Sequence, residues 1–170
     1  TVTIPKLLMQ VRQPLVSILA FSLMSNHYHF VLKEITDNGI SKFMHKVGTG
    51  YSAYFNLRND RNGSLFQGTY KAKHASDDRY LSYLFEYIHL NPVRSDLEAG
   101  EYINEDLISA VLENPFTSLR VYAGKEKGRL AEALLNQTEF YSVVHSFDEH
   151  INKLNQWNYS DFEGGLASLK

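Results

Sequence analysis

Two apolar segments joined by a very short polar connection constrain this fold more than any other feature of the chain. Residues 17–24 (SILAFSLM) form a short apolar run, and residues 28–35 (YHFVLKEI) are rich in aromatic and β-branched side chains. The connection is centred on Ser25 and Asn26, which favours an antiparallel β-hairpin. A single helix across both segments is the alternative that periodicity leaves open.

The hydrophobic period changes after this hairpin. Apolar residues recur at helical spacing over 39–58, which predicts an amphipathic helix with Asp37 or Asn38 as its cap. Gly48 and Gly50 interrupt the pattern, and each lowers helix stability by about 1 kcal/mol relative to alanine. They indicate close packing, a kink, or the approach of a ligand backbone.

The rest of the chain predicts one more strand and several helices. Alternation over residues 65–74 predicts a strand, and the acidic cap at residues 76–78 predicts a helix that ends before Pro92. One or two helices are predicted between residues 129 and 156, and the last dozen residues are expected to be loose.

Composition places the chain among globular intracellular proteins. Its 170 residues, 44% of them hydrophobic, suit one domain with a modest C-terminal extension and exclude wholesale disorder. The absence of cysteine excludes disulfides, thiolate metal sites and cysteine nucleophiles. The longest uncharged stretch, residues 13–32, contains Pro, Asn and His and predicts no membrane span, and no signal-peptide pattern is present. We therefore expect a cytoplasmic protein without a membrane partner.

Charge is distributed unevenly along the chain. Residues 1–100 carry 11 Lys and Arg against 8 Asp and Glu, whereas residues 101–170 carry 6 against 11. The net charge of −2 argues against a strongly electrostatic nucleic-acid binder. A mildly basic front half nevertheless permits a polyanion to contact that half alone.

His27 and His29 flank Tyr28 at the start of the second predicted strand. Because successive strand side chains point to opposite faces, both imidazoles lie on one face and Tyr28 lies on the other. Two neutral imidazoles at this spacing can bind one divalent cation. Most such pairs in soluble proteins are accidental, so the pair alone is a weak signal for a metal site.

Tyr87 and Asn91 lie four residues apart near the end of the second predicted helix, and therefore share one helix face with Tyr83. Taken alone, they are more readily read as an amphipathic tyrosine and a residue at the helix C-terminus before Pro92. His89 lies two positions from Tyr87, toward the other side of the helix, where packing or a hydrogen bond is the expected role.

Four segments together resemble the IS200-like transposases, and among them most closely the REP-associated tyrosine transposases. They are residues 23–32 (LMSNHYHFVL), 64–68 (SLFQG), 87–94 (YIHLNPVR) and 114–122 (NPFTSLRVY). The Asn-His-x-His block and the Tyr-Ile-x-x-Asn-Pro-Val block, in this order and spacing, are the specific part of the match. The resemblance covers roughly residues 16–124.

The resemblance implies a nuclease and strand transferase of the HUH type that acts on single-stranded DNA with stem-loops. It implies an α+β fold, with a ferredoxin-like or RRM-like antiparallel sheet that has helices on one face. His27 and His29 match the metal-binding pair, Tyr87 matches the nucleophile that forms a 5′-phosphotyrosine, and Asn91 falls at a third ligand position. An amide oxygen beside two imidazoles suits Mg²⁺ or Mn²⁺ better than a closed zinc site.

The resemblance also divides the chain and bears on its assembly. Residues 1–124 correspond to the transposase domain, and residues 125–170 to a helical C-terminal extension. Only 26 residues precede His27, and residues 6–12 look like the end of a family helix, so we expect the first family strand to be missing. The resemblance implies a homodimer if the chain follows the IS200-like enzymes proper, and a monomer if it follows the REP-associated group.

Basic residues interleaved with aromatic ones are the softer signal for DNA. Between residues 38 and 80 the chain carries seven Lys and Arg against three acids, with tyrosine and phenylalanine among them. This pattern is typical of backbone contacts with stacking platforms, although a solvated helix face explains it equally well. The predicted DNA-binding residues are Lys42, Lys46, Arg58, Arg61, Lys71, Lys73 and Arg94.

Two other functions compete with the transposase. A catalytically silent DNA-hairpin binder would keep the fold, and a short N-terminal part favours it, whereas the intact histidines and Tyr87 argue against it. A small metallohydrolase would use His27 and His29 with water as the nucleophile. The absence of a carboxylate partner near that pair in the sequence counts against the hydrolase.

Overall fold

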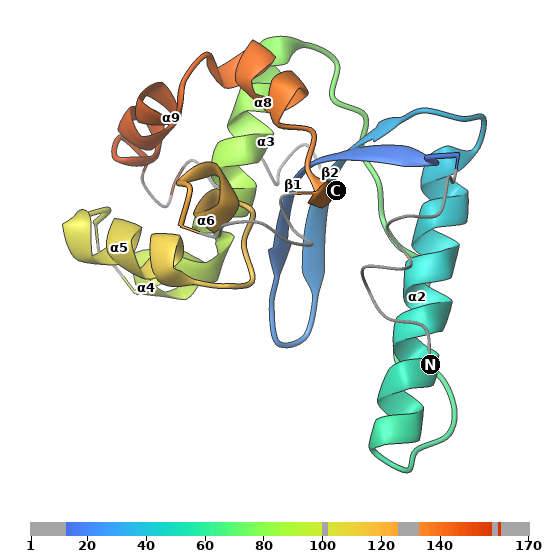
Figure 1. Cartoon of the computed structure of the whole chain (residues 1–170). Helices are drawn as coiled ribbons and strands as arrows, with labels where there is room; N and C mark the ends of the chain where they lie inside the picture. The colour runs from blue at the N-terminus through green and yellow to red at the C-terminus, as the bar shows by residue number, and fades with distance from the viewer. Residues whose placement is uncertain (1–12, 100–101, 126–132, 158–159, 161–170) are drawn as a thin grey trace. The chain divides into compact units, whose positions relative to one another are not determined.

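The computed structural model describes residues 13–99, 102–125, 133–157 and 160, and its fold is α+β, as the sequence predicts (Figure 1). The chain forms two compact units, which are described separately. The first consists of Lys33–Tyr70 with the residues up to Ser17, and the second of Ile18–Leu32 with the chain from Lys71 onward. Within the described ranges, no helix is long and apolar enough to cross a membrane.

The predicted hairpin is confirmed. Strand β1 (Val16–Leu23) pairs with β2 (Tyr28–Glu34) in a two-stranded antiparallel sheet. The backbone N–H of Met24 donates to the carbonyl of His27 at 2.9 Å and closes the turn. Both strands begin and end within one residue of the predicted bounds, because an apolar run bounded by polar residues marks a buried strand in local sequence.

The edge of β1 away from β2 is covered by two segments from much later in the chain. Leu23 and Phe21 exchange backbone hydrogen bonds with Phe116 and Ser118, and the N–H of Asn136 donates to the carbonyl of Ile18 at 2.9 Å. Isolated bridges pair Ser22 with Thr117 and Ile18 with Leu135. These segments satisfy backbone groups that an open strand edge would leave unpaired.

The second unit is otherwise helical. Its helices are α3 (Asp78–Leu90), α4 (Arg94–Glu98), α5 (Glu105–Glu113), α6 (Leu119–Tyr122), α8 (Gln137–Val144) and α9 (Phe147–Leu154), with the 3₁₀ turn η1 (Asn91–Val93) after α3. Side chains at the N-caps of α3, α5, α8 and α9 accept a hydrogen bond from the third residue of the helix, which satisfies otherwise unpaired donors. Helix α3 ends immediately before Asn91 and Pro92, as predicted.

The core of the second unit forms around α3. Phe85 and Leu90 of α3 are completely buried, and α8 and α9 pack on the same helix. Phe140 of α8 lies 4.8 Å from Phe85 between ring centroids and stacks on Tyr122 at 3.8 Å. One or two helices are predicted between residues 129 and 156; α8 and α9 both lie in this range, and they share the core of α3.

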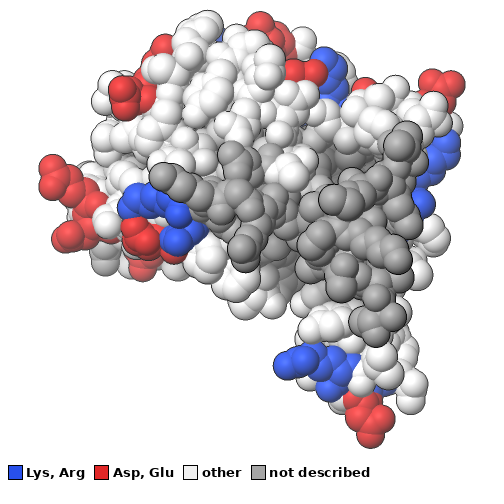
Figure 2. Space-filling model, viewed as in Figure 1, with Lys and Arg blue, Asp and Glu red and all other residues white. Residues whose placement is uncertain are grey.

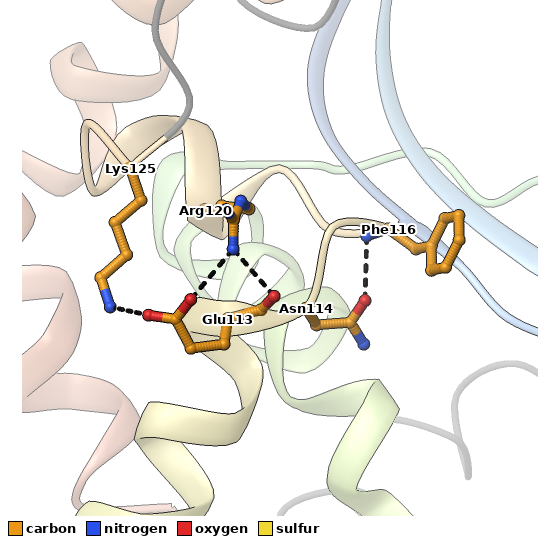
Figure 3. A network of polar contacts seen from close by, with 5 residues as sticks. All are labelled: Glu113, Asn114, Phe116, Arg120 and Lys125. Atoms are coloured by element: carbon orange, nitrogen blue, oxygen red, sulfur yellow. Dashed lines mark hydrogen bonds and ion pairs between the residues drawn. The ribbon is translucent and has the colours of Figure 1, made fainter.

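Charged side chains on α5 and α6 meet in an exposed network (Figure 3). Arg120 donates to the Glu113 carboxylate at 3.1 Å and to its backbone carbonyl at 2.9 Å, and Lys125 pairs with the same carboxylate. The carboxylates of Glu105 and Asp106 are exposed on α5 as well. Acidic side chains accordingly gather over this part of the molecule in Figure 2, in keeping with the acidic composition of the later chain.

The first unit contains one long helix, α2 (Gly39–Arg58), with the predicted bounds. Asn38 is its N-cap in the left-handed conformation and makes no side-chain cap, while Glu34 accepts from the N–H of Ile40 at 3.1 Å. A Cβ at Gly39 would lie 2.1 Å from the carbonyl oxygen of Leu15, so this position requires glycine.

The strand predicted in this region is wrong, and one of the three interpretations of Gly48 and Gly50 is excluded. Residues 65–74 form no strand, because residues 63–70 are attached to α2 by side chains rather than by a backbone ladder. Asn56 donates to the carbonyl of Gly63 at 2.8 Å, and the hydroxyls of Ser41 and Tyr70 lie 2.9 Å apart. Helix α2 continues through Gly48 and Gly50, and a Cβ at either would meet nothing within 4 Å, so neither glycine marks close packing.

Some expectations fall on parts of the chain that are not described. They are the helix end at residues 6–12 and, apart from Ser160, the last dozen residues. The missing first strand and the domain boundary at residue 124 stay predictions.

Candidate active site

The imidazoles of His27 and His29 lie together at the start of β2, in the second unit. Their ring centroids are 5.1 Å apart in an edge-to-face arrangement. Tyr28 and Phe30 pair with each other at 5.3 Å, as strand alternation requires of residues on the opposite face. The hairpin therefore places both histidines on one face, as their spacing predicts.

Asn26 orients the first of these imidazoles. Its side-chain oxygen lies 2.6 Å from Nδ1 of His27, and an amide oxygen can only accept, so Nδ1 of His27 carries the proton. The lone pair of the neutral ring then resides on Nε2, which is free to bind a cation. Partners of this kind fix the tautomer and direction of histidine ligands in metal sites.

His29 is held in its neutral form. Burial, with the nearby charges of His27 and Arg94, lowers the pKa of His29 to about 4. A neutral imidazole retains the lone pair that a metal ligand needs. The positive charge of Arg94 thus acts in the same direction as burial on the pKa of His29.

Helix α3 brings Tyr87 to the same place. The ring of Tyr87 lies edge-on against His29 with centroids 5.6 Å apart, and only 6% of Tyr87 is exposed. Tyr80, Tyr83 and Tyr87 follow one another along the helix at 5.9 and 6.3 Å, as residues three or four positions apart do. His29 is thus the common neighbour of His27 and Tyr87.

Asn91 follows one helical turn after Tyr87. Its backbone has helical angles (φ −55°, ψ −35°), so its side chain shares the face of Tyr87. Asn91 is 6% exposed, and its amide nitrogen is buried without a hydrogen-bond partner. The unpaired atom is a hydrogen-bond donor, so it suits an acceptor group and is not itself a metal ligand.

The residues present fit a divalent cation with few protein ligands. No cluster of three or more His, Asp or Glu that could hold a metal ion occurs within the described segments. The predicted ligands stay His27, His29 and the amide oxygen of Asn91, which is a hard donor beside two borderline ones. Three protein ligands leave positions for substrate oxygens.

The predicted DNA-binding residues divide between the two units. Lys42, Lys46, Arg58 and Arg61 belong to the first unit, and Lys71, Lys73 and Arg94 to the second; all except Arg94 are exposed. Arg61 lies over the ring of Phe55 at 5.6 Å, and Lys73 lies over the ring of Tyr80 at 5.1 Å. Lys42 donates to the carbonyl of Asp37 at 2.8 Å.

Sequence reasoning missed the partners of α3 that come from far along the chain. Trp157 stacks on Tyr83 at 5.1 Å, and its indole N–H donates to the buried carboxylate of Glu86 at 2.7 Å. His89 is bonded to Ser118 and His150 in the core. The sequence predicts packing or a hydrogen bond for His89 but does not identify its partner. No local signal in the sequence identifies Trp157, Ser118 or His150 as partners of α3.

Comparison with known proteins points to one family. A search of curated proteins and a search of solved structures each found no match. The model of a protein family described as "Transposase IS200 like" matches residues 9–91, just under half of the chain. This range includes His27, His29, Tyr87 and Asn91, and similarity to the family suggests a role in DNA transposition. Residues 9–91 are thus similar to an IS200-like transposase domain.

Proposed function

We propose that this protein cleaves and rejoins single-stranded DNA near hairpins, with Tyr87 as the nucleophile and Mg²⁺ or Mn²⁺ bound by His27, His29 and Asn91. The observation that carries the proposal is the position of His29, whose ring contacts both His27 and Tyr87. A candidate nucleophile and a candidate metal ligand pair then act on one phosphate. The match over residues 9–91 supports DNA as the substrate.

Cleavage requires one bond to form and one to break at the scissile phosphorus. The Tyr87 oxygen attacks and loses its proton, a phosphotyrosine ester to the 5′ side forms, and the bond to the 3′ oxygen breaks. That oxygen takes up a proton and leaves as a free 3′-OH. Attack by another 3′-OH reverses the step and joins strands, so the bond energy is retained and no nucleotide cofactor is needed.

The other residues of the site support this chemistry in distinct ways. A bound divalent cation would polarise the phosphate and stabilise the charge that develops on its oxygens. Asn26 would hold the His27 ring with Nε2 toward the cation. The guanidinium of Arg94, whose charge lowers the pKa of His29, would attract the phosphate to the site.

The burial of Tyr87 favours one alternative. Only 6% of the residue is exposed, so little of its side chain is accessible to a DNA strand. A silent DNA-hairpin binder would need no such access and would keep the same fold.

A labelled-hairpin cleavage assay tests the proposal. Hairpins labelled at the 5′ or the 3′ end are incubated with Mg²⁺ or Mn²⁺ and resolved on a denaturing gel that reveals a protein–DNA adduct. We expect a metal-dependent adduct that Tyr87→Phe abolishes and that the control Tyr102→Phe, at an 81% exposed tyrosine, retains. Hairpin binding without an adduct would establish the silent binder, and cleavage that survives in Tyr87→Phe would establish the hydrolase.

A further inference from the structure

A chain of buried polar side chains connects the far side of α3 to strand β1. Nε2 of His89 lies 2.8 Å from Oγ of Ser118, and Nδ1 of His89 lies 2.7 Å from Nε2 of His150 in α9. All three side chains are completely buried in the second unit. Polar groups are rarely placed so deeply unless their hydrogen bonds fix a particular arrangement.

Ser118 joins this chain to the sheet. It is the N-cap of α6, yet its hydroxyl makes no cap and instead accepts from the N–H of Phe21 at 2.9 Å. The same hydroxyl lies 3.2 Å from the carbonyl of Phe21, which also accepts from the N–H of Ser118. The hydroxyl of Ser118 therefore contacts β1 and His89 and does not cap α6.

One arrangement of protons satisfies every donor. His150 donates through Nε2 to Nδ1 of His89, His89 donates through Nε2 to Ser118, and Ser118 donates to the carbonyl of Phe21. Only Nδ1 of His150 then lacks a partner, as a lone pair. The reverse arrangement would bury an unpaired N–H at that atom, and unpaired buried donors are rarer than unpaired acceptors.

We propose that His89, Ser118 and His150 form a positioning relay with this proton arrangement, which sets where α3 lies against the hairpin and therefore where Tyr87 lies against His29. His89 and Tyr87 are two residues apart, about 200° around the helix, so α3 is held on both sides at the same level. Tyr87 meets β2 through His29, and His89 meets β1 through Ser118. The catalytic part of this proposal rests on the proposed function of Tyr87.

The surroundings of the relay keep its imidazoles neutral. Rings of Tyr122 and Phe140 lie 6.0 Å from that of His89, and Phe140 lies 5.3 Å from His150. Both imidazoles are completely buried, and burial favours the uncharged form of a histidine. Neutral rings can each donate one hydrogen bond and accept another, as the arrangement requires.

The first experiment reads the tautomers and the geometry without any activity. Long-range ¹H–¹⁵N NMR spectra of the full chain at pH 7 should show both His89 and His150 protonated at Nε2 alone. In the wild type, ring-to-ring NOEs should connect Tyr87 with His29. These NOEs should be weaker in Ser118→Ala and should have wild-type strength in Ser118→Thr, because threonine keeps a hydroxyl. The matched control, His145→Asn, replaces an exposed histidine, and it should leave the NOEs unchanged.

The second experiment reads catalysis separately from folding and binding. At a temperature where every variant is folded, single-turnover adduct formation should slow by about 10- to 100-fold in Ser118→Ala and His89→Gln, with hairpin affinity unchanged. Protonation of either histidine at Nδ1 would overturn the relay. Tyr87–His29 NOEs that persist at full strength in Ser118→Ala and His89→Gln would also overturn it. Equal losses of rate and affinity would overturn its positioning role. An adduct absent from the wild type would instead contradict the proposed function, while the NMR result still decides the relay.

Discussion

His29 lies edge-on against Tyr87, and its ring is also the nearest aromatic neighbour of His27 on the same strand face. One imidazole therefore connects the hairpin with Tyr87 of α3, which lies 58 residues later in the sequence. A substitution that moves the hairpin or α3 should therefore move the other element through this contact.

Removal of Asn26 should weaken metal binding without removing a ligand. Asn26→Ala frees Nδ1 of His27 and lets the ring change tautomer, so Mn²⁺ affinity should fall by about 10- to 100-fold. Titration calorimetry with Mn²⁺ measures this, with Ser25→Ala, at the neighbouring exposed residue, as the control. Equal affinities for Asn26→Ala and wild type would mean that His27 is not a ligand or that its tautomer is fixed otherwise.

Alanine at the open glycines of α2 should stabilise the protein. Gly48→Ala and Gly50→Ala each remove the backbone freedom of a helical glycine and meet no neighbour, for a gain of up to about 1 kcal/mol each. Chemical denaturation monitored by circular dichroism gives the free energy of unfolding. A loss of stability in either variant would indicate a close contact at that face of α2.

Gly39 should respond in the opposite direction. Its Cβ would overlap the carbonyl oxygen of Leu15, so Gly39→Ala should destabilise the first unit although alanine is the better helix former. The same denaturation experiment provides the comparison, and a neutral result would show that the backbone at Leu15 moves aside easily.

Stability should fall as the pH is lowered through the histidine range. Burial, with the charge of Lys153, lowers the pKa of His150 to about 3 in the folded protein, whereas the unfolded chain takes up this proton near pH 6.5. Between these values the unfolded state binds more protons, so stability decreases by about 1.4 kcal/mol per pH unit for this residue. Above pH 6.5 this contribution no longer changes.

The pH dependence can be measured by urea unfolding followed through the fluorescence of Trp157. This is the single tryptophan, and it is buried against Tyr83 of α3. Comparison of pH 7 and pH 5.5 keeps most carboxylates ionised. The slope should be smaller in His150→Leu and unchanged in the control His45→Gln, at an exposed histidine. An equal slope in His150→Leu would mean that His150 is accessible to protons in the folded state.

The charged network on α5 and α6 should contribute little to stability. The Glu113 carboxylate is exposed, and exposed ion pairs are offset by solvation and side-chain entropy. Glu113→Gln should therefore leave the urea midpoint unchanged, while Val111→Ala, at a completely buried residue of the same helix, should lower it clearly. A large shift in Glu113→Gln would show that the network orders the α5–α6 connection (Figure 3).

Local patterns were sufficient for the hairpin, for α2 and for α3. Each of these elements is bounded by residues that act on their immediate neighbours, such as Asp77 at the N-cap of α3 and Pro92 beyond its end. The spacing of His27 and His29 likewise determined their common face. These features depend on a few adjacent residues and can be read from them.

The failures have the opposite character. Residues 65–74 alternate like a strand, but a strand needs a partner, and this segment is instead attached to α2 by side chains such as Tyr70. The partners of His89, at sequence separations of 29 and 61 residues, depend on how α6 and α9 pack. Such pairs are determined by the tertiary structure alone, so neither the hydrophobic periodicity nor the residue types predict them.

The coverage of β1 by residues 116–118 and 135–136 has a consequence for the nascent protein. Ile18 leaves the ribosome well before Asn136, its hydrogen-bond partner, has been synthesised. At 5–20 residues per second, translation of the 118 residues between them takes roughly 6 to 24 s. For that time an apolar strand edge is available to any other unpaired chain, so yield in the cell should depend on what shields the ribosome exit during this interval.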